Sequence, residues 1–469
     1  MMRKTVVCLP FLFMLPSAAL RAQATPSAED AQLAVTVDSI ARQVLQATGV
    51  PSASIAVVKN GRLAYANAYG AARLDPAVPA RPDMRYSIGS VSKQFAAAAI
   101  LLLQEEGKLS LDDPVARYLP SLTRAKEVTI RQLLSHTSGY QDYWPQDYVP
   151  PFMMQPITAN VILDGWARRP LDFEPGTRWQ YSNTNYVIAG LIVERVSGMP
   201  FFEFLRARIL TPLGMGSVVN IDLGKLPESD PTGYMQYALG PRHPAPKEGK
   251  GWLFAAGELA MTAADLAKWD IAMIHQSLLR PASYRVMERE VVLDNGAGTG
   301  YGLGVDVSMN GGRRVISHGG EVSGFTASNM VYPDDQAAVI VLTNQDAVSA
   351  SGVIGQRIAN ALFSTDDATT RQREVQAREI FAGLQRGSID RALFSDNANA
   401  YFNDTALADF ASSLGPLGDP TSFVQVGQQL RGGMQLRVYR ATFKERTLRI
   451  WTFELPDGKL EQYQVAGQS

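Results

Sequence analysis

The sequence is almost without cysteine. Cys8 is the only cysteine in 469 residues, and it lies within an apolar run near the N-terminus. The chain that follows this run therefore has no thiol with which to form a disulfide bond. The same absence excludes a cysteine nucleophile, so any nucleophilic chemistry must use another side chain.

The sequence also lacks an excess of charge of either sign. It holds 44 lysines and arginines against 45 aspartates and glutamates, a formal net charge of −1. Nucleic acids and anionic membrane surfaces attract basic proteins, so we expect neither as a partner. Hydrophobic residues make up 46% of the chain, enough for a sizeable core, and the length predicts two or more domains.

Long hydrophobic runs are confined to the N-terminus. Met1-Met2-Arg3-Lys4 is basic, the stretch from Thr5 to Leu20 is apolar, and Ala22-Gln23-Ala24 has the small residues of a cleavage site. This pattern predicts a secretory signal peptide over residues 1–24. We therefore expect an exported protein, periplasmic or extracellular. It would have no integral membrane segment once the signal is removed, since no later run is long enough to span a bilayer.

Motifs for metals and cofactors are absent as well. The four histidines and the carboxylates show no spacing typical of a metal site, and no glycine-rich loop follows a strand pattern as dinucleotide binding requires. His243 and His275 lie far from any other motif, which favours surface positions for both. The sequence thus predicts a protein that works without a metal or cofactor.

The patterns that are present predict a mixed fold. Residues 27–48 have helical spacing, and two strand patterns flank Asn60-Gly61, a strong hairpin signal. Residues 108–250 show short helical patterns and frequent proline, which indicates a mostly helical region. Four strands and a final helix are then expected, at Tyr301–Val307, Arg314–Ser317, Phe325–Tyr332, Ala337–Thr343 and Ser349–Phe363. The hairpin connections favour an antiparallel sheet flanked by helices, in the α/β (α+β) class, over residues 28–365.

A polar stretch separates this region from the C-terminal one. Residues 364–370 have the composition of a linker. Beyond them, a helical pattern from Val375 to Leu384 precedes four strand patterns, and Asp457-Gly458 predicts the last turn. We predict that residues 371–469 form a separate small α+β domain, whose helix-then-strands order resembles the nuclear-transport-factor-2-like fold.

Ser90 and Lys93 give the first indication of chemistry. They lie three residues apart at the start of an apolar helical stretch that ends at Gly107. In a helix, two such side chains share one face, about 5–6 Å apart between their Cβ atoms. A serine hydroxyl needs a base within hydrogen-bond reach to act as a nucleophile, and a buried lysine with a lowered pKa can be that base. Alone, the pattern is equally typical of a helix cap followed by a solvated lysine.

Three further stretches complete the pattern. They are Tyr181-Ser182-Asn183 after a Pro-Gly pair, His318-Gly319-Gly320-Glu321 in a strand position, and Ser135-His136-Thr137 between the first two motifs. Ser-x-x-Lys, Tyr-x-Asn and His-x-Gly in this order resemble the signature motifs of the serine β-lactamase and penicillin-binding-protein superfamily, in its class C branch. The resemblance covers residues 28–365 and implies a β-lactamase/transpeptidase-like sheet with a helical subdomain.

The resemblance implies roles for the first two motifs. Ser90 would be the nucleophile, at a helix N-terminus that favours developing negative charge. Lys93 and Tyr181 would share the role of base, and the nearby ammonium would favour the Tyr181 phenolate. Asn183 would donate to a substrate carbonyl and accept from Lys93. His136, although it lies in a family stretch, is expected to have a structural, capping role.

The third motif would bind the substrate. By the family pattern, the backbone N–H groups of Ser90 and Glu321 form the oxyanion hole, and Gly319 and Gly320 let the substrate lie close to the strand. The class C branch usually has Lys-Thr-Gly where this chain has His318-Gly319-Gly320. Lysine and threonine help to hold a substrate carboxylate, whereas a histidine is only partly charged at neutral pH and glycine has no hydroxyl. We therefore expect weak recognition of carboxylates and inefficient hydrolysis of β-lactams.

The sequence favours an exported serine hydrolase, a peptidase or esterase that forms an acyl-enzyme on Ser90. Its substrate would be a small molecule, an ester or a peptide. A D,D-carboxypeptidase or penicillin-binding protein acting on peptidoglycan-derived peptides, or a weak β-lactamase, is the alternative within this class. A non-catalytic protein that binds the cell wall or a partner is the alternative from another class. Such a protein has no physical need of Ser90, Lys93, Tyr181 and Asn183 together.

Overall fold

The computed structural model describes residues 28–363 and 368–467, and the chain divides into two compact units. The first unit takes the residues up to Ser308 together with Arg314–Ile358, and the second takes Met309–Arg313 and the residues from Ala359 on. Each unit has its own cluster of buried hydrophobic side chains. The expected signal peptide over residues 1–24 lies outside the described residues, and the domain boundary expected at residues 365–371 stays a prediction.

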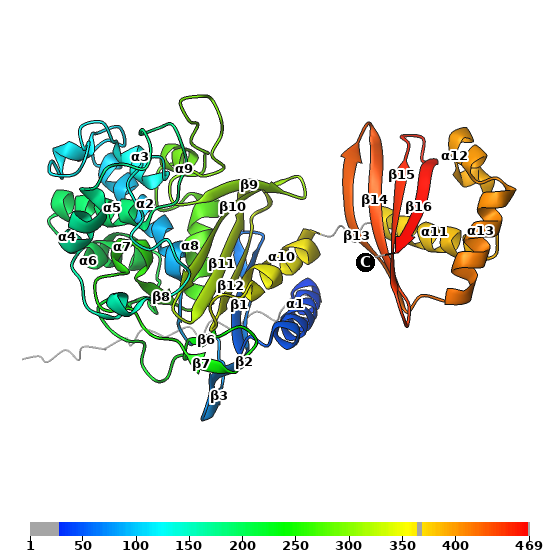
Figure 1. Ribbon diagram of the computed structural model, residues 1–469, viewed down its shortest axis with the longest axis horizontal. Coiled ribbons are helices and arrows are strands. Elements are labelled where there is room, and N and C mark those ends of the chain that lie inside the picture. The colour runs from blue at the N-terminus through cyan, green and yellow to red at the C-terminus, as the bar shows by residue number, and fades with distance from the viewer. Residues whose placement is uncertain (1–27, 364–367, 468–469) are drawn as a thin grey trace, which may run out of the picture. The chain divides into compact units, whose positions relative to one another are not determined.

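A seven-stranded sheet forms the centre of the first unit (Figure 1). Its strand order is β3-β2-β1-β12-β11-β10-β9, and the pairings from β3 through to β10 are antiparallel, which confirms the expected fold class. The strands are β1 (Ser52–Lys59), β2 (Arg62–Leu74), β3 (Ala77–Pro79), β9 (Asp306–Asn310), β10 (Arg313–Val322), β11 (Phe325–Tyr332) and β12 (Ala337–Thr343). Every residue of β12 is buried, which explains its continuous apolar sequence.

The hairpin between β1 and β2 forms where the sequence predicts it. Lys59 pairs with Arg62 across a two-residue turn. Asn60 and Gly61 both have positive φ, 53° and 67°. Asparagine and glycine tolerate this conformation best, and it matches the twist of the flanking strands. The turn therefore starts the antiparallel pairing of β1 with β2, whose register shifts once, at an irregularity between Val57 and Val58.

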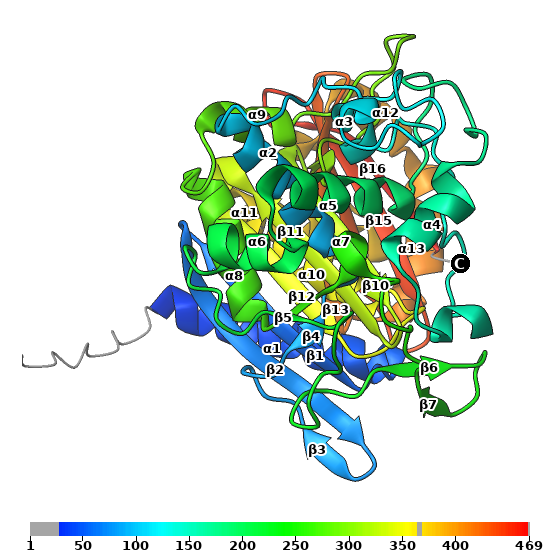
Figure 2. The same cartoon turned by 90° about the vertical axis from the view of Figure 1, so that its left-hand side faces the viewer.

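Three helices cover the sheet (Figures 1 and 2). Figure 1 shows α8 (Ala263–His275) on one face, with α1 (Ala28–Thr48) and α10 (Ala350–Phe363) on the other. α8 contacts β1, β2 and β12, and α1 contacts β1 and β2. Among the described residues, no helix combines the length and apolar character needed to cross a membrane.

The expected helical region lies on the α8 side of the sheet and is built around α2 (Ser92–Glu105). α2 contacts α5, α6 and α7, and twelve of its fourteen residues are buried. The other helices of the first unit are α3 (Ile130–Leu134), α4 (Ala159–Ile162), α5 (Asn183–Ser197), α6 (Phe201–Leu205), α7 (Phe254–Gly257) and α9 (Pro281–Met287). Short strands lie between them: β4 (Tyr86–Ser87), β5 (Val219–Asn220) and β8 (Leu259–Met261) in one sheet, β6 (Tyr234–Gln236) and β7 (Arg242–Pro244) in another.

One expected strand was placed wrongly. The pattern predicted a strand from Tyr301 to Val307, but β9 begins only at Asp306. The residues before it form a loop in which Gly304 has φ +75° and Gly302 has no room for a Cβ beside the carbonyl oxygen of Met287. The two glycines therefore serve a close-packed loop instead of a strand.

The second unit is an α+β structure, as expected. Three helices, α11 (Ala368–Gln385), α12 (Asp396–Tyr401) and α13 (Asp404–Leu414), precede four strands. The strands are β13 (Ser422–Arg431), β14 (Met434–Thr442), β15 (Thr447–Glu454) and β16 (Leu460–Gly467), antiparallel and in sequence order. Buried side chains from α11 and the strands share the second core. The sequence did not predict α12 and α13, and the likeness to the nuclear-transport-factor-2-like fold stays a prediction.

We predict that the first unit folds and keeps its chemistry without the second. A chain that ends after Thr370 keeps the whole of the first hydrophobic core and every motif residue. It should be soluble, melt in one transition and react with a fluorophosphonate at Ser90, at a rate close to that of the full chain. Labelling followed by mass spectrometry measures this. An insoluble or unlabelled product would show that the two units depend on each other.

Candidate active site

Ser90 lies just before α2 and not at its first residue. It occupies a 3-10 turn, Gly89–Val91, and α2 begins at Ser92. The backbone of Val91 is helical, with φ −56° and ψ −23°, so the turn continues into the helix. The side chains of Ser90 and Lys93 therefore share one face, and Lys93 Nζ lies 2.9 Å from Ser90 Oγ.

Lys93 is fully buried, with 0% of its surface exposed. Its Nζ atom forms two further hydrogen bonds, to Asn183 Oδ1 and to the carbonyl oxygen of Ala256, both at 2.8 Å. Burial lowers the pKa of Lys93 to about 7, and the negative charge of Asp142 opposes this shift. A large fraction of the amine is therefore neutral at pH 7, which a solvated lysine would not be.

The three partners of Lys93 orient its lone pair. A neutral amine has two N–H donors and one lone pair. The carbonyl of Ala256 and Oδ1 of Asn183 can only accept hydrogen bonds, so they take both donors. Ser90 is the one partner with a proton to give. In the neutral state, the lone pair of Lys93 therefore faces the Ser90 hydroxyl, as removal of that proton requires.

Asp142 holds Asn183 in the orientation that Lys93 needs, and the sequence did not predict it. One carboxylate oxygen of Asp142 accepts from the backbone N–H of Asn183 at 2.9 Å, and the other accepts from Asn183 Nδ2 at 3.3 Å. A carboxylate cannot accept from an amide oxygen, so Nδ2 must face Asp142 and Oδ1 must face Lys93. The carboxylate also lies at the N-terminus of α5, where negative charge is favourable.

Tyr181 lies beside the same amine. Lys93 Nζ is 5.0 Å from the centroid of the Tyr181 ring. Burial raises the pKa of the Tyr181 phenol far above its ordinary value, and an interaction with the Ser90 hydroxyl only partly opposes this. The expectation that the lysine would favour a phenolate was therefore wrong for the free site: Tyr181 is a neutral hydroxyl, because the loss of solvent outweighs the hydrogen bond with Ser90.

His136 contacts the segment that carries Tyr181 through two hydrogen bonds and its ring. Its Nδ1 accepts from the backbone N–H of Ser182 at 3.1 Å, and its carbonyl accepts from the N–H of Gln180 at 3.0 Å. Its ring stacks on Tyr181, with centroids 4.3 Å apart. Burial, and then the charge of Lys93, lower the pKa of His136 well below its ordinary value. A neutral, fully buried histidine in this place fits the structural role expected for it.

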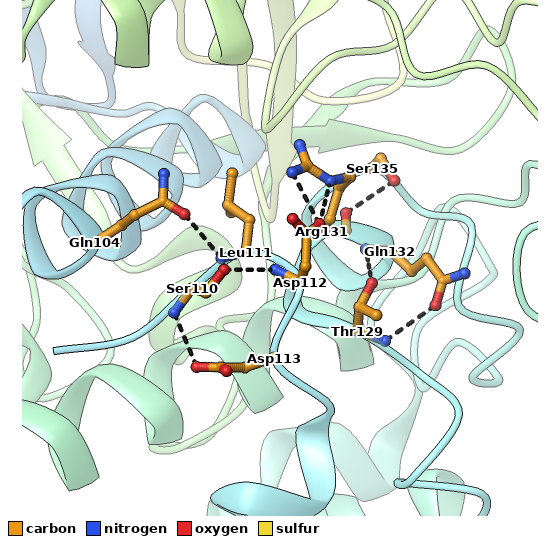
Figure 3. Close-up of polar contacts among 9 residues, drawn as sticks. All are labelled: Gln104, Ser110, Leu111, Asp112, Asp113, Thr129, Arg131, Gln132 and Ser135. Carbon is orange, nitrogen blue, oxygen red and sulfur yellow. Dashed lines mark hydrogen bonds and ion pairs between the residues drawn. The ribbon is translucent and has the colours of Figure 1, made fainter. Parts of the chain in front are cut away.

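A network of polar contacts fixes the segment between α2 and α3 (Figure 3). The N–H of Leu111 donates to Oε1 of Gln104 on α2 at 2.8 Å. Arg131 on α3 donates to Asp112 at 2.9 Å. The first turn of α3 is closed by a capping box, and the hydroxyl of Ser135 donates to the carbonyl of Arg131 at its end. The loop is thus tied to both helices, which fixes the turn that carries His136.

The third motif meets the Ser90 turn backbone to backbone. Gly89 has φ +50°, and a Cβ on it would lie 2.7 Å from the backbone nitrogen of Glu321. A Cβ on Gly320 would overlap the carbonyl oxygen of Ile88 and lie 3.3 Å from the nitrogen of Ser90. Only glycine permits this approach. The two backbone segments that carry the expected oxyanion-hole donors, the nitrogens of Ser90 and Glu321, are thereby brought into close contact.

His318 is buried and points away from solvent, with 5% of its surface exposed. Its Nδ1 donates to the carbonyl of Gly319, so its Nε2 accepts from the Tyr301 hydroxyl at 2.9 Å. Burial, and then the charge of Lys93, lower the pKa of His318 to about 4. The histidine is therefore neutral at physiological pH, where the sequence predicted partial charge. It supplies no cation for a substrate carboxylate.

A cavity of about 500 Å³ opens beside Ser90. Ser90, Asn183, Ala256 and Glu321 are among the residues that line it. The volume is sufficient for a small-molecule or dipeptide-sized substrate. Within the described ranges, no group of three or more His, Cys, Asp or Glu residues is arranged to hold a metal ion. Of the predicted site residues, Ser90, Lys93, Tyr181 and Asn183 converge with the backbone of Glu321. The His318 ring lies close to this group, with its centroid 6.2 Å from that of the Tyr181 ring, but His318 is not one of the described residues that line the cavity.

Comparison with known proteins agrees with this geometry. A family model described as Beta-lactamase matches residues 37–362, which is more than half of the chain. The chain belongs to this family. Its members of known activity among the relatives are serine hydrolases with the β-lactamase fold, and this chain is an enzyme of that kind.

Individual proteins similar to this chain match most of its length. Penicillin-binding protein 4* of Bacillus subtilis is 28% identical over 81% of this chain and 84% of its own length. The structure of a D-amino acid amidase from Ochrobactrum anthropi, complexed with D-phenylalanine, is 26% identical, with a TM-score of 0.64 over 71% of this chain and 99% of the amidase. A class C β-lactamase at 22% identity has a TM-score of 0.60 over 73% of this chain and 100% of its own, and shares the fold.

The close approach at Gly320 gives a test with an internal control. Gly320→Ala should lower the free energy of unfolding by about 1–3 kcal/mol, because the new methyl group overlaps the carbonyl of Ile88. It should also slow the reaction of Ser90 with a fluorophosphonate by about 10²-fold, the usual effect of losing one oxyanion donor. Denaturant unfolding and the labelling rate measure the two effects.

Gly319→Ala is the matched control. A Cβ at this position would meet only the carbonyl oxygen of Ala327, at 3.9 Å, which is ordinary contact. This neighbouring variant should stay within about 0.5 kcal/mol of the native protein and label at a similar rate. Equal effects of the two substitutions would contradict the packing of β10 against the Ser90 turn.

Proposed function

We propose that this protein hydrolyses esters or amides through a covalent acyl-enzyme on Ser90. The observation that carries the proposal is the contact between Lys93 Nζ and Ser90 Oγ, 2.9 Å, with the amine buried and its pKa lowered to about 7. Lysine is a base only when it is neutral, and burial makes the neutral form accessible. A non-catalytic binding protein would gain nothing from this arrangement.

The reaction follows from the site. Ser90 Oγ bonds to the substrate carbonyl carbon while its proton passes to Lys93 Nζ. The backbone N–H groups of Ser90 and Glu321 stabilise the oxyanion. The carbonyl then re-forms, the C–O or C–N bond breaks, and the leaving group takes the proton. A water molecule then attacks the acyl-enzyme through the same steps. The carboxylic acid is released and Ser90 is restored.

Tyr181 serves in this scheme as a neutral hydroxyl. It interacts with Ser90, and its raised pKa keeps its proton in place. It can therefore donate to the leaving group and recover a proton from Lys93, without acting first as a base. In this scheme, Lys93 is the base for acylation and Tyr181 is a proton donor beside it.

The site favours a peptidase, amidase or esterase over a β-lactamase. β-Lactams carry a carboxylate, and His318 is neutral where the class C pattern has a lysine. The likeness to a D-amino acid amidase complexed with D-phenylalanine supports an amide substrate. We further propose that the protein is exported, because residues 1–24 have the sequence of a signal peptide.

Ser90→Ala tests the assignment directly. The native protein should gain the mass of one fluorophosphonate adduct, on a peptide that contains Ser90. The variant should gain none and keep its melting temperature, and its turnover of p-nitrophenyl esters should fall by at least about 10³-fold. An adduct on another serine, or undiminished turnover, would overturn the assignment.

The pKa of Lys93 predicts the pH dependence of acylation. Because the amine must be neutral, the labelling rate should rise on the order of tenfold per pH unit below pH 7 and level off above it. Asp142→Asn removes a charge that raises the pKa of Lys93, so the midpoint should move to lower pH. Labelling rates measured between pH 5 and 9, for the native protein and the variant, give both the profile and the shift of its midpoint. A midpoint that moves upward in the variant, or a flat profile, would exclude Lys93 as the base.

A further inference from the structure

The described residues that line the cavity beside Ser90 include carboxylates and no cationic side chain. Asp147, Glu321 and Asp346 line it, and none of its lining residues in the described part of the chain is lysine, arginine or histidine. A cavity of one sign raises the local concentration of ligands of the other sign. The candidate nucleophile, Ser90, lines the same cavity, so the charge bears directly on which substrates reach it.

Backbone donors hold two of these carboxylates in place. Oε1 of Glu321 accepts from the N–H of Ala347 at 2.8 Å, and Oδ2 of Asp346 accepts from the N–H of Gly324 at 2.9 Å. Each contact uses one oxygen, so the other remains available to a ligand. Within the described residues, neither carboxylate has a lysine or arginine partner. Burial raises the pKa of Glu321, the N–H of Ala347 lowers it, and the nearby charges of Asp346 and Asp147 raise it again, as like charges do.

Aromatic side chains share the cavity with the carboxylates. Tyr148 and Tyr237 line it and are 64% and 69% exposed, although each could bury a large apolar surface. Trp144 lies beside them and donates its Nε1–H to the carbonyl of Tyr148 at 3.1 Å. Aromatic faces attract organic cations and cover apolar groups. The combination therefore fits an organic ammonium with an apolar side chain better than it fits a metal ion.

We propose that Glu321 and Asp346, with Asp147 at the rim, bind the protonated amine of the substrate and make this enzyme selective for substrates with a free amine. Glu321 supplies both the oxyanion N–H and a carboxylate, so the amine lies within a few bonds of the reacting carbonyl. This describes an α-amino acid ester or amide, or the N-terminal residue of a peptide, with an apolar or aromatic side chain against Tyr148 and Tyr237. The inference rests on the acyl-enzyme proposed for Ser90.

Competition at Ser90 tests the proposal on the full chain. The probes are phenylalanine amide, N-acetylphenylalanine amide and 3-phenylpropanamide, the first two in both enantiomers. The measurement is the concentration of each that halves the rate of fluorophosphonate labelling. The free amine should be effective at a concentration lower by about tenfold or more than either neutral amide, the worth of one charge-assisted hydrogen bond.

Variants assign the selectivity to the carboxylates. Glu321→Gln and Asp346→Asn should each reduce the ratio between free and acetylated amine, and the double variant should bring it close to one. Asp83→Asn is the matched control, because Asp83 is exposed, outside the cavity and paired with Arg81. It should keep the native ratio. Melting temperatures verify that each variant folds. If one of them does not fold, Asp147→Asn takes its place and should likewise reduce the ratio.

The outcomes separate this inference from the proposed function. If Ser90 is labelled but the three amides compete equally, or the double variant keeps the native ratio, ammonium selectivity is wrong and the acyl-enzyme stands. If Ser90 is not labelled, the acyl-enzyme is wrong. Calorimetric titration of the same amides into the Ser90→Ala protein then decides the ammonium site by itself. Tighter binding of the free amine supports it, and equal binding overturns it.

Discussion

The buried amine of Lys93 is the contact on which the rest of the site depends. Burying a charged ammonium without partners is costly, so the fold must supply hydrogen bonds on every side of it. These come from the turn before α2, from the first residue of α5 and from the backbone of α7, segments far apart in the sequence. Each must be in place before the amine is satisfied. The same burial that makes the position costly also lowers the pKa of Lys93 to about 7, which the proposed role of Lys93 as a base requires.

On the other side of Ser90, the site depends on close contact between the backbones of the Ser90 turn and β10. Gly89 and Gly320 let the Ser90 turn and β10 approach until a Cβ on either glycine would overlap the backbone of the other segment. A third glycine, Gly304, lies against the carbonyl of Lys93, where a Cβ would be 2.8 Å from that oxygen. The glycines therefore belong to one packing arrangement around the start of α2. Because interiors are close-packed, an added methyl group at these positions must shift the catalytic backbone.

The sequence predicted what is encoded locally. The Asn60-Gly61 turn predicted the hairpin of β1 and β2 in the central sheet, and motif spacing predicted the convergence of Ser90, Lys93 and Asn183. Asp142 could not be predicted, because a single aspartate in an irregular loop carries no periodic signal. The neutral states of Tyr181 and His318 were missed for a related reason: they arise from burial, which depends on residues such as Tyr301 that are distant in sequence. The strand predicted from Tyr301 is a loop up to Asp306. From sequence alone, the glycines that allow close packing in this loop cannot be told from glycines within a strand.

The charges around Ser90 act on one another. The amine of Lys93 has a pKa lowered to about 7, His318 is neutral, and carboxylates line the neighbouring cavity. A neutral base does not repel a cationic substrate, whereas a lysine with an ordinary pKa would. A bound ammonium would in turn disfavour the protonated form of Lys93, since two like charges in one cavity repel. Under the two proposals, binding of such a substrate would thus shift Lys93 further toward its basic form, and the substrate cation would help to activate Ser90.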